Sequence, residues 1–338
     1  MNYKLYITNI ILIIFLIIMY YLNSIVWVLE FILSICFYTI FFYGLHLIWS
    51  KIRKNNPLTS INFIKYFLYR ISTLLLFFTI FFWWISYLSN EVYPAKMPEY
   101  TISNWEKTVK FQAMSHIWTQ SFYDNVRLNL KKYKEDNWVY FFEWVKPWTK
   151  ENLDKFNNAI WIKFDKDLYK NFSKLYWVVN QDNQYFMWLV NNNDFNVDIN
   201  MDQIVELYEK KLNSKENNKK YKNKLPVDAN KVIIETLSQL NNKELKILVY
   251  INQAILNFII WSDNTQTFLT ENFANKDLFE VILWERNKVI ANSIINSEYN
   301  KIYMTYWLLH FKWVLKLLQK NDKRWKIIWT KNLYPIKN

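Results

Sequence analysis

A set of long apolar runs near the N-terminus restricts the fold of this chain most strongly. Leu5 to Leu22 is 18 residues without a charge, and Phe31 to Trp49 and Ile71 to Ser89 supply 19 residues each. A helix that spans a bilayer needs about 20 predominantly apolar residues. A cleaved signal peptide is the alternative for the first run, but no small-residue cleavage site follows it. We therefore predict a membrane anchor with three transmembrane helices in residues 1–90.

The charges of the short loops predict the orientation of this anchor. One acidic residue, Glu30, lies between the first two runs. Four basic residues lie between the second and third runs: Lys51, Arg53, Lys54 and Lys65. Because cytoplasmic loops are enriched in Lys and Arg, this basic loop is expected in the cytoplasm. The N-terminus is two crossings away from the loop and is therefore expected on the same side. The chain is then a multi-pass protein of the cell membrane whose C-terminal domain is extracytoplasmic.

The rest of the chain carries only a modest positive charge. The residues after 90 hold 36 of the 42 basic and 28 of the 29 acidic side chains, a net charge of +8. A dense basic run, Lys215 to Lys224, lies in a lysine-rich linker near residues 213–226, without aromatic residues arranged to stack on bases. We expect no nucleic-acid partner. The single cysteine, Cys36, excludes a disulfide framework and a zinc site of several cysteines.

From residue 98 to 338 short strand-like runs alternate with longer helical ones. Lys107 to Met114 alternates polar and apolar residues as a half-buried strand does. Further strands are expected at Val139–Phe142, Lys301–Tyr306 and Lys326–Leu333, and helices at Thr119–Asp136, Lys150–Asn158, Asp165–Leu175, Met201–Leu212, Ala229–Leu240, Lys243–Ile260, Asp277–Ile295 and Leu308–Lys320. The pattern predicts an α/β domain with a mixed sheet and two strand–His–helix units, one around His116 and one around His310.

Two histidines and a glutamate lie where predicted strands end. His116 and His310 each follow a strand closely, and Glu143 ends a third strand. Groups just past the carboxyl ends of strands in an α/β sheet tend to converge on a site. Two imidazoles and a carboxylate are the minimum set for a catalytic metal that keeps a position open for water. The alternatives are ordinary hydrogen-bonded histidines and a charged strand end without a partner.

A polar run, Glu285-Arg286-Asn287, lies in the helix before the second strand–His–helix unit. Because neighbouring residues on a helix diverge by about 100°, only one or two of the three can point inward, and the remainder belong to a solvated face. Arg286 suits a bidentate hold on a carboxylate.

Together with this run, four short motifs occur in an order that resembles the TraB/PrgY/GumN family, which includes the Tiki proteins. They are Ala113-Met114-Ser115-His116, Phe142-Glu143, Glu285-Arg286-Asn287 and Trp307-Leu308-Leu309-His310. The resemblance covers residues 105–335 approximately. The family has Gly-x-x-His as its first and last motif, and this chain departs from that pattern at Ala113 and Trp307.

The resemblance implies a membrane-anchored, metal-dependent hydrolase, a metallopeptidase that acts on a peptide or protein outside the cytoplasm. It implies a divalent metal (Zn, Mn or Co) held by His116 and His310 with help from Glu143. Two alternatives remain open. PrgY-like members imply a non-catalytic surface binder of peptide signals, of the pheromone-shutdown type. An envelope structural protein with coincidental motifs is the other, and it predicts that the two histidines lie far apart.

The same resemblance gives roles to the polar run on the helix. Glu285 is expected to be an outer carboxylate or a general base that activates metal-bound water. Arg286 is expected to orient a substrate carboxylate or a metal-ligating glutamate. Asn287 is expected to donate a hydrogen bond to an oxyanion.

The departure at Trp307 draws attention to the glycine content. The chain has one glycine, Gly44, and 18 tryptophans, whereas glycine makes up about 7% of average proteins. Only glycine takes positive φ cheaply, yet tryptophan stands at several glycine-like places: Trp118, Trp138 after Asn137, Trp144, Trp148 after Pro147, and Trp307. We predict that many of these tryptophans are UGA codons that the source organism reads as glycine. A genuinely tryptophan-rich protein is the alternative, and Trp325 is a position where tryptophan is plausible.

Overall fold

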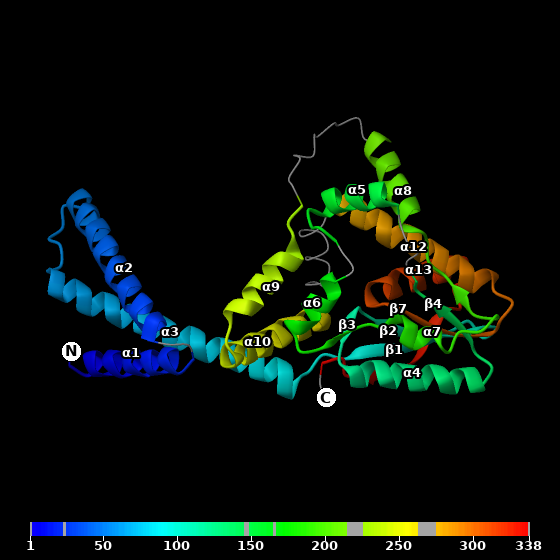
Figure 1. Cartoon of the computed structure of the whole chain (residues 1–338), viewed down its shortest axis with the longest axis horizontal. Coiled ribbons are helices and arrows are strands. Elements are labelled where there is room, and N and C mark those ends of the chain that lie inside the picture. The colour runs from blue at the N-terminus through cyan, green and yellow to red at the C-terminus, as the bar shows by residue number, and fades with distance from the viewer. Residues whose placement is uncertain are drawn as a thin grey trace. The chain divides into compact units, whose positions relative to one another are not determined.

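The computed structural model describes residues 2–22, 25–144, 149–164, 167–214, 226–262 and 275–336 (Figure 1). The chain divides into two compact units. The first consists of Met1–Leu88 with Ser238–Ile251, and the second consists of Ser89–Leu237 with Asn252–Asn338. Most of the predicted lysine-rich linker, and Trp148 with Pro147, lie outside the described residues.

The first unit contains the apolar N-terminal helices α1 (Asn2–Leu22), α2 (Ile25–Ile52) and α3 (Ser60–Tyr87). Among the described residues, three helical segments are long and apolar enough to cross a membrane: Val28–Ile52, Ser60–Val92 and Asn242–Trp261. The first predicted span forms a shorter apolar helix, Tyr6–Leu22. These helices support a membrane protein, and the third segment belongs to a helix that we had expected in the C-terminal domain.

The second unit is built on a mixed six-stranded sheet, as the sequence predicts. Its strand order is β6-β4-β7-β2-β1-β8. The strands are β1 (Met97–Ser103), β2 (Thr108–Met114), β4 (Val139–Phe142), β6 (Phe195–Asn196), β7 (Lys301–Trp307) and β8 (Lys326–Leu333). β6, β4, β7 and β2 run parallel, whereas β1 pairs antiparallel with both β2 and β8. β1 and the very short β6 were not predicted from the sequence.

Helices cover both faces of this sheet (Figure 1). Successive side chains of a strand point to opposite faces. Tyr303 of β7 packs on Tyr133 of α4 (Gln120–Glu135), with ring centroids 4.9 Å apart. On the opposite face, Tyr100 of β1 stacks on Phe311 of α13 (Phe311–Asn321) at 3.7 Å. The inner strands β2, β4 and β7 are therefore mostly buried on both sides, whereas the edge strand β8 is mostly exposed.

The remaining elements lie around this core. Between His116 and α4 the chain forms β3 (Ile117–Trp118), which pairs with β5 (Val179–Asn180), and α13 is preceded by a 3₁₀ turn at Leu308–His310. α5 (Lys150–Ile160), α8 (Met201–Ser214) and α12 (Lys276–Asn296) enclose a second apolar cluster. The other helices are a π-helical turn at Leu88–Val92, α6 (Leu168–Lys174), α7 (Asn183–Met187), α9 (Ala229–Gln239) and α10 (Asn242–Trp261).

Among the described residues, three tryptophans have the backbone conformation that normally requires glycine. Trp105, Trp161 and Trp177 have φ of 78°, 58° and 48°. Trp177 follows α6 in a Schellman arrangement, in which its N–H donates to Lys174 O and the N–H of Val178 donates to Ser173 O. The predicted glycine-like positions behave differently. Before β4 it is Asn137 that has positive φ (62°), and Trp307 has an ordinary φ of −58°.

Candidate functional site

The carboxyl ends of the four parallel strands bring several polar side chains to one edge of the sheet. His116 follows β2, Glu143 follows β4, Asp198 follows β6 and His310 follows β7. Both histidines lie close enough to Glu143 for their charge to affect its pKa. Each histidine therefore interacts with the same carboxylate. The interpretation in which the motifs are coincidental is not tested by this contact.

Arg286 of α12 connects the two carboxylates of this edge. Its Nε donates to Asp198 Oδ1 at 2.7 Å, and its Nη2 donates to Asp198 Oδ2 at 2.8 Å. Nη2 also donates to Glu143 Oε1. The other oxygen of Glu143 accepts from the backbone N–H of Trp307 at 3.1 Å. The Tyr306 hydroxyl donates to Asp198 Oδ1 at 3.0 Å. One buried guanidinium thus holds both carboxylates in fixed orientations.

Burial and charge set the ionisation of these groups. Burial opposes the ionised form of Glu143, but the charge of Arg286, the two histidines and the hydrogen bond from Arg286 together outweigh it and lower the pKa of Glu143 below its ordinary value. Burial raises the pKa of Asp198 despite its contact with Arg286. We therefore take Glu143 as ionised at neutral pH, paired with a guanidinium whose own pKa is raised well above its ordinary value.

His310 is held in one tautomer. The residue has no exposed surface, and its Nδ1 lies 2.8 Å from Asn287 Oδ1. Because an amide oxygen can only accept, Nδ1 carries the hydrogen. Nε2 then presents a lone pair, and among the described residues it has no hydrogen-bond partner. Burial lowers the pKa of His310 to about 3, so the imidazole is neutral across the physiological range.

His116 follows β2. Its ring packs on Tyr169 of α6, with centroids 4.5 Å apart, and its backbone carbonyl accepts from the N–H of Gln181 at 2.7 Å. Burial lowers the pKa of His116 below its ordinary value. The site therefore has two neutral imidazoles beside one ionised carboxylate.

The three residues of the polar run on α12 separate as helical geometry requires. Arg286 faces the carboxylates and Asn287 faces His310. Glu285 instead forms an ion pair with Lys288 at 2.8 Å. Arg286 donates to Glu143, and its predicted role beside a metal ion or a substrate carboxylate stays a prediction. The oxygen of Asn287 binds a histidine.

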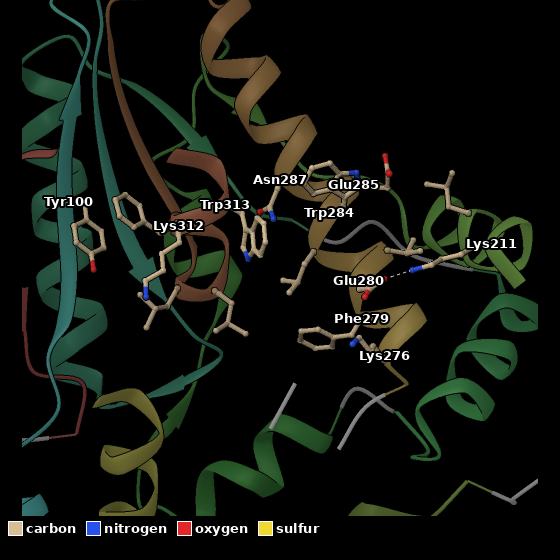
Figure 2. Close-up of a pocket in the computed structure, with 16 residues that line it drawn as sticks. Tyr100, Lys211, Lys276, Phe279, Glu280, Trp284, Glu285, Asn287, Lys312 and Trp313 are labelled. Carbon is tan, nitrogen blue, oxygen red and sulfur yellow. Dashed lines mark hydrogen bonds and ion pairs between the residues drawn. The ribbon is translucent and has the colours of Figure 1, made fainter. Parts of the chain in front are cut away.

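A cavity of about 800 Å³ lies beside this cluster (Figure 2). Glu285 and Asn287 line it from α12, and Lys312 and Trp313 line it from α13. The wall is mainly apolar: Leu207, Phe279, Val281, Leu283, Trp284, Leu308, Leu309 and Phe311. Lys211 of α8 enters the wall through its ion pair with Glu280. Asn287 therefore contacts both the cavity and His310, whereas the two histidines and Glu143 do not line the cavity.

The predicted metal ligands fit a divalent ion in chemistry but are not grouped as a ready-made site. His310 has the state of a metal-binding imidazole, with one nitrogen hydrogen-bonded to an outer partner and the other bare. Glu143 is already bound by Arg286 and by the Trp307 N–H. Within the described ranges, no three His, Cys, Asp or Glu side chains gather closely enough to hold a metal ion.

Asp198 and Tyr306 belong to the cluster without having been predicted from the sequence. Asp198 follows a two-residue strand inside the asparagine-rich stretch Asn191–Asn200, which has no strand-like periodicity. A buried guanidinium can bind two carboxylates. Arg286 was therefore a reason to look for a second acidic residue beside Glu143. Tyr306 is the penultimate residue of β7, and its aromatic character suggested only a core position.

The fold and site define an α/β protein with apolar helices of membrane-spanning length and a buried carboxylate–arginine–histidine cluster at the edge of its parallel strands. No protein-family model, curated protein or solved structure matches the chain. The resemblance to the TraB/PrgY/GumN family therefore stays a prediction.

Proposed function

We propose that this chain is a membrane-anchored, metal-dependent hydrolase that cleaves peptides outside the cytoplasm. The observation that carries the proposal is the bare, buried Nε2 of His310, in a histidine that interacts electrostatically with Glu143. An unpaired polar atom in a core costs free energy, so its retention favours a ligand. The two strand–His–helix units, around His116 and His310, are part of this proposal.

His116, His310 and Glu143 are the residues that would hold the ion. A divalent ion bound there would lower the pKa of a bound water to near neutrality and polarise a carbonyl oxygen. The chain's own groups prepare this site. Asn287 keeps the Nδ1 hydrogen of His310, and Arg286 keeps the Glu143 carboxylate ionised and oriented. Glu285 is placed in the cavity wall, where it contacts a bound peptide instead of the ion.

The cavity beside Asn287 is the proposed place for the peptide. Its volume of about 800 Å³ lies in the range of small-ligand sites, which are mostly apolar with a few polar groups. The apolar wall suits apolar side chains of an extended peptide, and Asn287 lies at the end of the cavity that meets His310. A substrate bound there approaches the histidine cluster through a shared residue.

A binder without catalysis is the second candidate, and one observation favours it. The charge of the Glu143 carboxylate is balanced by Arg286, and the described residues contain no group of three side chains that could hold a metal ion. In this reading the cavity holds a peptide signal, and the cluster stabilises the sheet edge.

Metal content and peptide cleavage, measured on the same full-length preparations, distinguish the two functions. The protein in lipid nanodiscs is loaded with zinc, manganese or cobalt, desalted, analysed for bound metal and incubated with a peptide library. We expect one metal ion per chain and cleavage. Both should be lost in His310→Ala and His116→Ala and kept in His46→Ala, which removes the remaining histidine, in α2. Peptide binding without metal or cleavage would establish the binder instead.

A further inference from the structure

The second half of α10 has its polar face turned inward and its apolar face turned outward. Three amides of this half donate to or accept from the second unit. Asn252 Nδ2 donates to Leu175 O at 3.1 Å, and Gln253 Nε2 donates to Tyr176 O at 2.7 Å. Asn257 is 2% exposed and bonds to Ala95 N and Asn90 Oδ1, both at 3.0 Å. A helix on a water-exposed surface has the opposite arrangement.

The outward face of α10 is an apolar stripe. Ile247, Ile255 and Phe258 are 44%, 50% and 49% exposed. At about 100° per residue they fall within a sector of about 80° on the helix. The 15 residues from Ile247 to Trp261 contain no charged side chain. Scattered exposed apolar residues are normal, but an uncharged stripe of this length on a helix that meets the criteria for a membrane span indicates contact with lipid.

The sheet excludes a span at this position. β2 and β4 precede α10 in the chain and β7 follows it, yet β7 pairs with both. β8 likewise follows α10 and pairs with β1. A single crossing of the bilayer between Asn242 and Trp261 would put these partners on opposite sides of the membrane. A single crossing by α10 is therefore incompatible with this sheet.

The start of α10 is continuous with the membrane anchor. Asn241 Nδ2 donates to Leu22 O, the last residue of α1. Lys243 Nζ donates to Tyr21 O at 3.0 Å and lies 3.5 Å from the centroid of the Tyr21 ring. These contacts lie within the first unit. If α1, α2 and α3 each cross the membrane, the ends of α1 and α3 emerge on the same side, so α10 begins at a membrane surface.

We propose that α10 is an interfacial helix that lies in the bilayer surface with Ile247, Ile255 and Phe258 in the acyl region. Such helices bury their apolar face by about 5–10 Å below the headgroups. The three inward amides attach the α/β unit to this helix. The proposal does not depend on the proposed hydrolase activity.

Position-specific quenching in vesicles tests this proposal on the full-length chain. Single cysteines replace Ile255 or Phe258 in a Cys36→Ser background, and each is labelled with an environment-sensitive fluorophore. The control is Leu128→Cys, on α4 of the same unit, where the native side chain is 64% exposed. The proteins are reconstituted into phosphatidylcholine vesicles that carry nitroxides either near the headgroup or deep in the acyl chain.

We expect shallow nitroxides to quench the labels at 255 and 258 several-fold more strongly than the label at 128. Equal quenching at all three positions would show that α10 faces water and would overturn the proposal. Stronger quenching by deep than by shallow nitroxides would indicate insertion across the bilayer and would also overturn it. A third outcome is that the labels are protected from aqueous quenchers but not quenched by nitroxides. If this protection disappears on dilution into excess lipid, the stripe binds a second copy of the chain instead of lipid.

Discussion

Asn287 Oδ1 accepts the Nδ1 hydrogen of His310 at 2.8 Å, and this contact fixes which nitrogen of the imidazole is free. Of the two partners, Asn287 also lines the cavity, whereas His310 is completely buried. The amide thus connects a solvent-accessible pocket to a buried lone pair. It is the point at which a ligand in the cavity can affect His310 without touching it.

Removing this amide is expected to weaken metal binding. Asn287→Leu keeps the approximate volume but lets the imidazole change tautomer and turn. Loss of an outer partner of a metal-ligating histidine typically costs 10–100-fold in affinity, and we expect a decrease of about that size for zinc, measured by competition with a chelating dye. Asn287→Asp, which keeps an acceptor, should retain most of the affinity. Asn292→Leu, an exposed residue on the same helix, is the matched control, and an equal loss there would contradict the assignment.

Arg286 is expected to be the most sensitive residue of the cluster for stability. Arg286→Met leaves Glu143 and Asp198 as buried carboxylates without a counter-charge. Breaking a buried pair on one side costs about 3–5 kcal/mol, and we expect a loss of that order in thermal unfolding monitored by circular dichroism. Asp198→Asn in the same chain should restore part of it. Arg324, which is half-exposed and pairs with Glu106 at 2.7 Å, provides the control: Arg324→Met should change little.

The neutral state of His310 predicts a stability change in acid. Its folded pKa is about 3, against an ordinary value of about 6.5. Because burial lowers the pKa, the unfolded chain binds a proton that the folded chain does not between these values. The contribution of His310 is therefore complete above pH 6.5 and is lost as pH falls towards 3, at up to about 1.4 kcal/mol per pH unit.

Unfolding of the full-length protein at several pH values, with chelator present, measures this contribution. His310→Gln, which cannot titrate, should show a shallower fall below pH 6.5 than the wild type. The matched variant is His46→Gln in α2, which should leave the slope unchanged. Parallel pH profiles for wild type and His310→Gln would show that the imidazole is accessible to protons in the folded state.

Much of the α/β unit could be predicted because its elements have local signals. The alternation in Lys107–Met114 and the apolar run Val139–Phe142 correspond to β2 and β4 within one residue. β6 could not be found, because a strand of two residues has no period to recognise and depends on its pairing with β4. The pattern of Lys243–Ile260 predicts a helix but not the partners of its amides, because Asn252, Gln253 and Asn257 bond to distant segments of the chain.

The sequence indicated which residues follow the parallel strands but not their contacts. His116, Glu143 and His310 follow β2, β4 and β7, which run parallel. The spacing of Glu285, Arg286 and Asn287 indicated that they diverge. It could not indicate that Arg286 would bind Glu143, because that contact depends on the position of α12 over the sheet. Trp307 contributes its backbone N–H to Glu143 with ordinary φ, so the argument for glycine at that position loses its conformational basis.

The tryptophans with positive φ provide the last prediction. A left-handed conformation costs a non-glycine residue about 1–2 kcal/mol. Trp161 and Trp177 adopt this conformation, and their side chains are 38% and 54% exposed. Trp161→Gly and Trp177→Gly should therefore each stabilise the folded protein by about 1 kcal/mol. The control is Trp138→Gly, which should destabilise it, because that ring packs on Tyr133 at 5.5 Å and lies under Lys110.

The backbone conformation and burial of each tryptophan predict which codon encodes it. If UGA is read as glycine in the source organism, positions 105, 161 and 177 should carry UGA, whereas Trp325, which is 2% exposed in the core, should carry UGG. Peptide masses of the protein isolated from its native cells would then show glycine at the first three positions and tryptophan at 325. UGG at 105, 161 and 177 would refute the reassignment where the backbone most favours it, and the strain would then be a property of a truly tryptophan-rich chain.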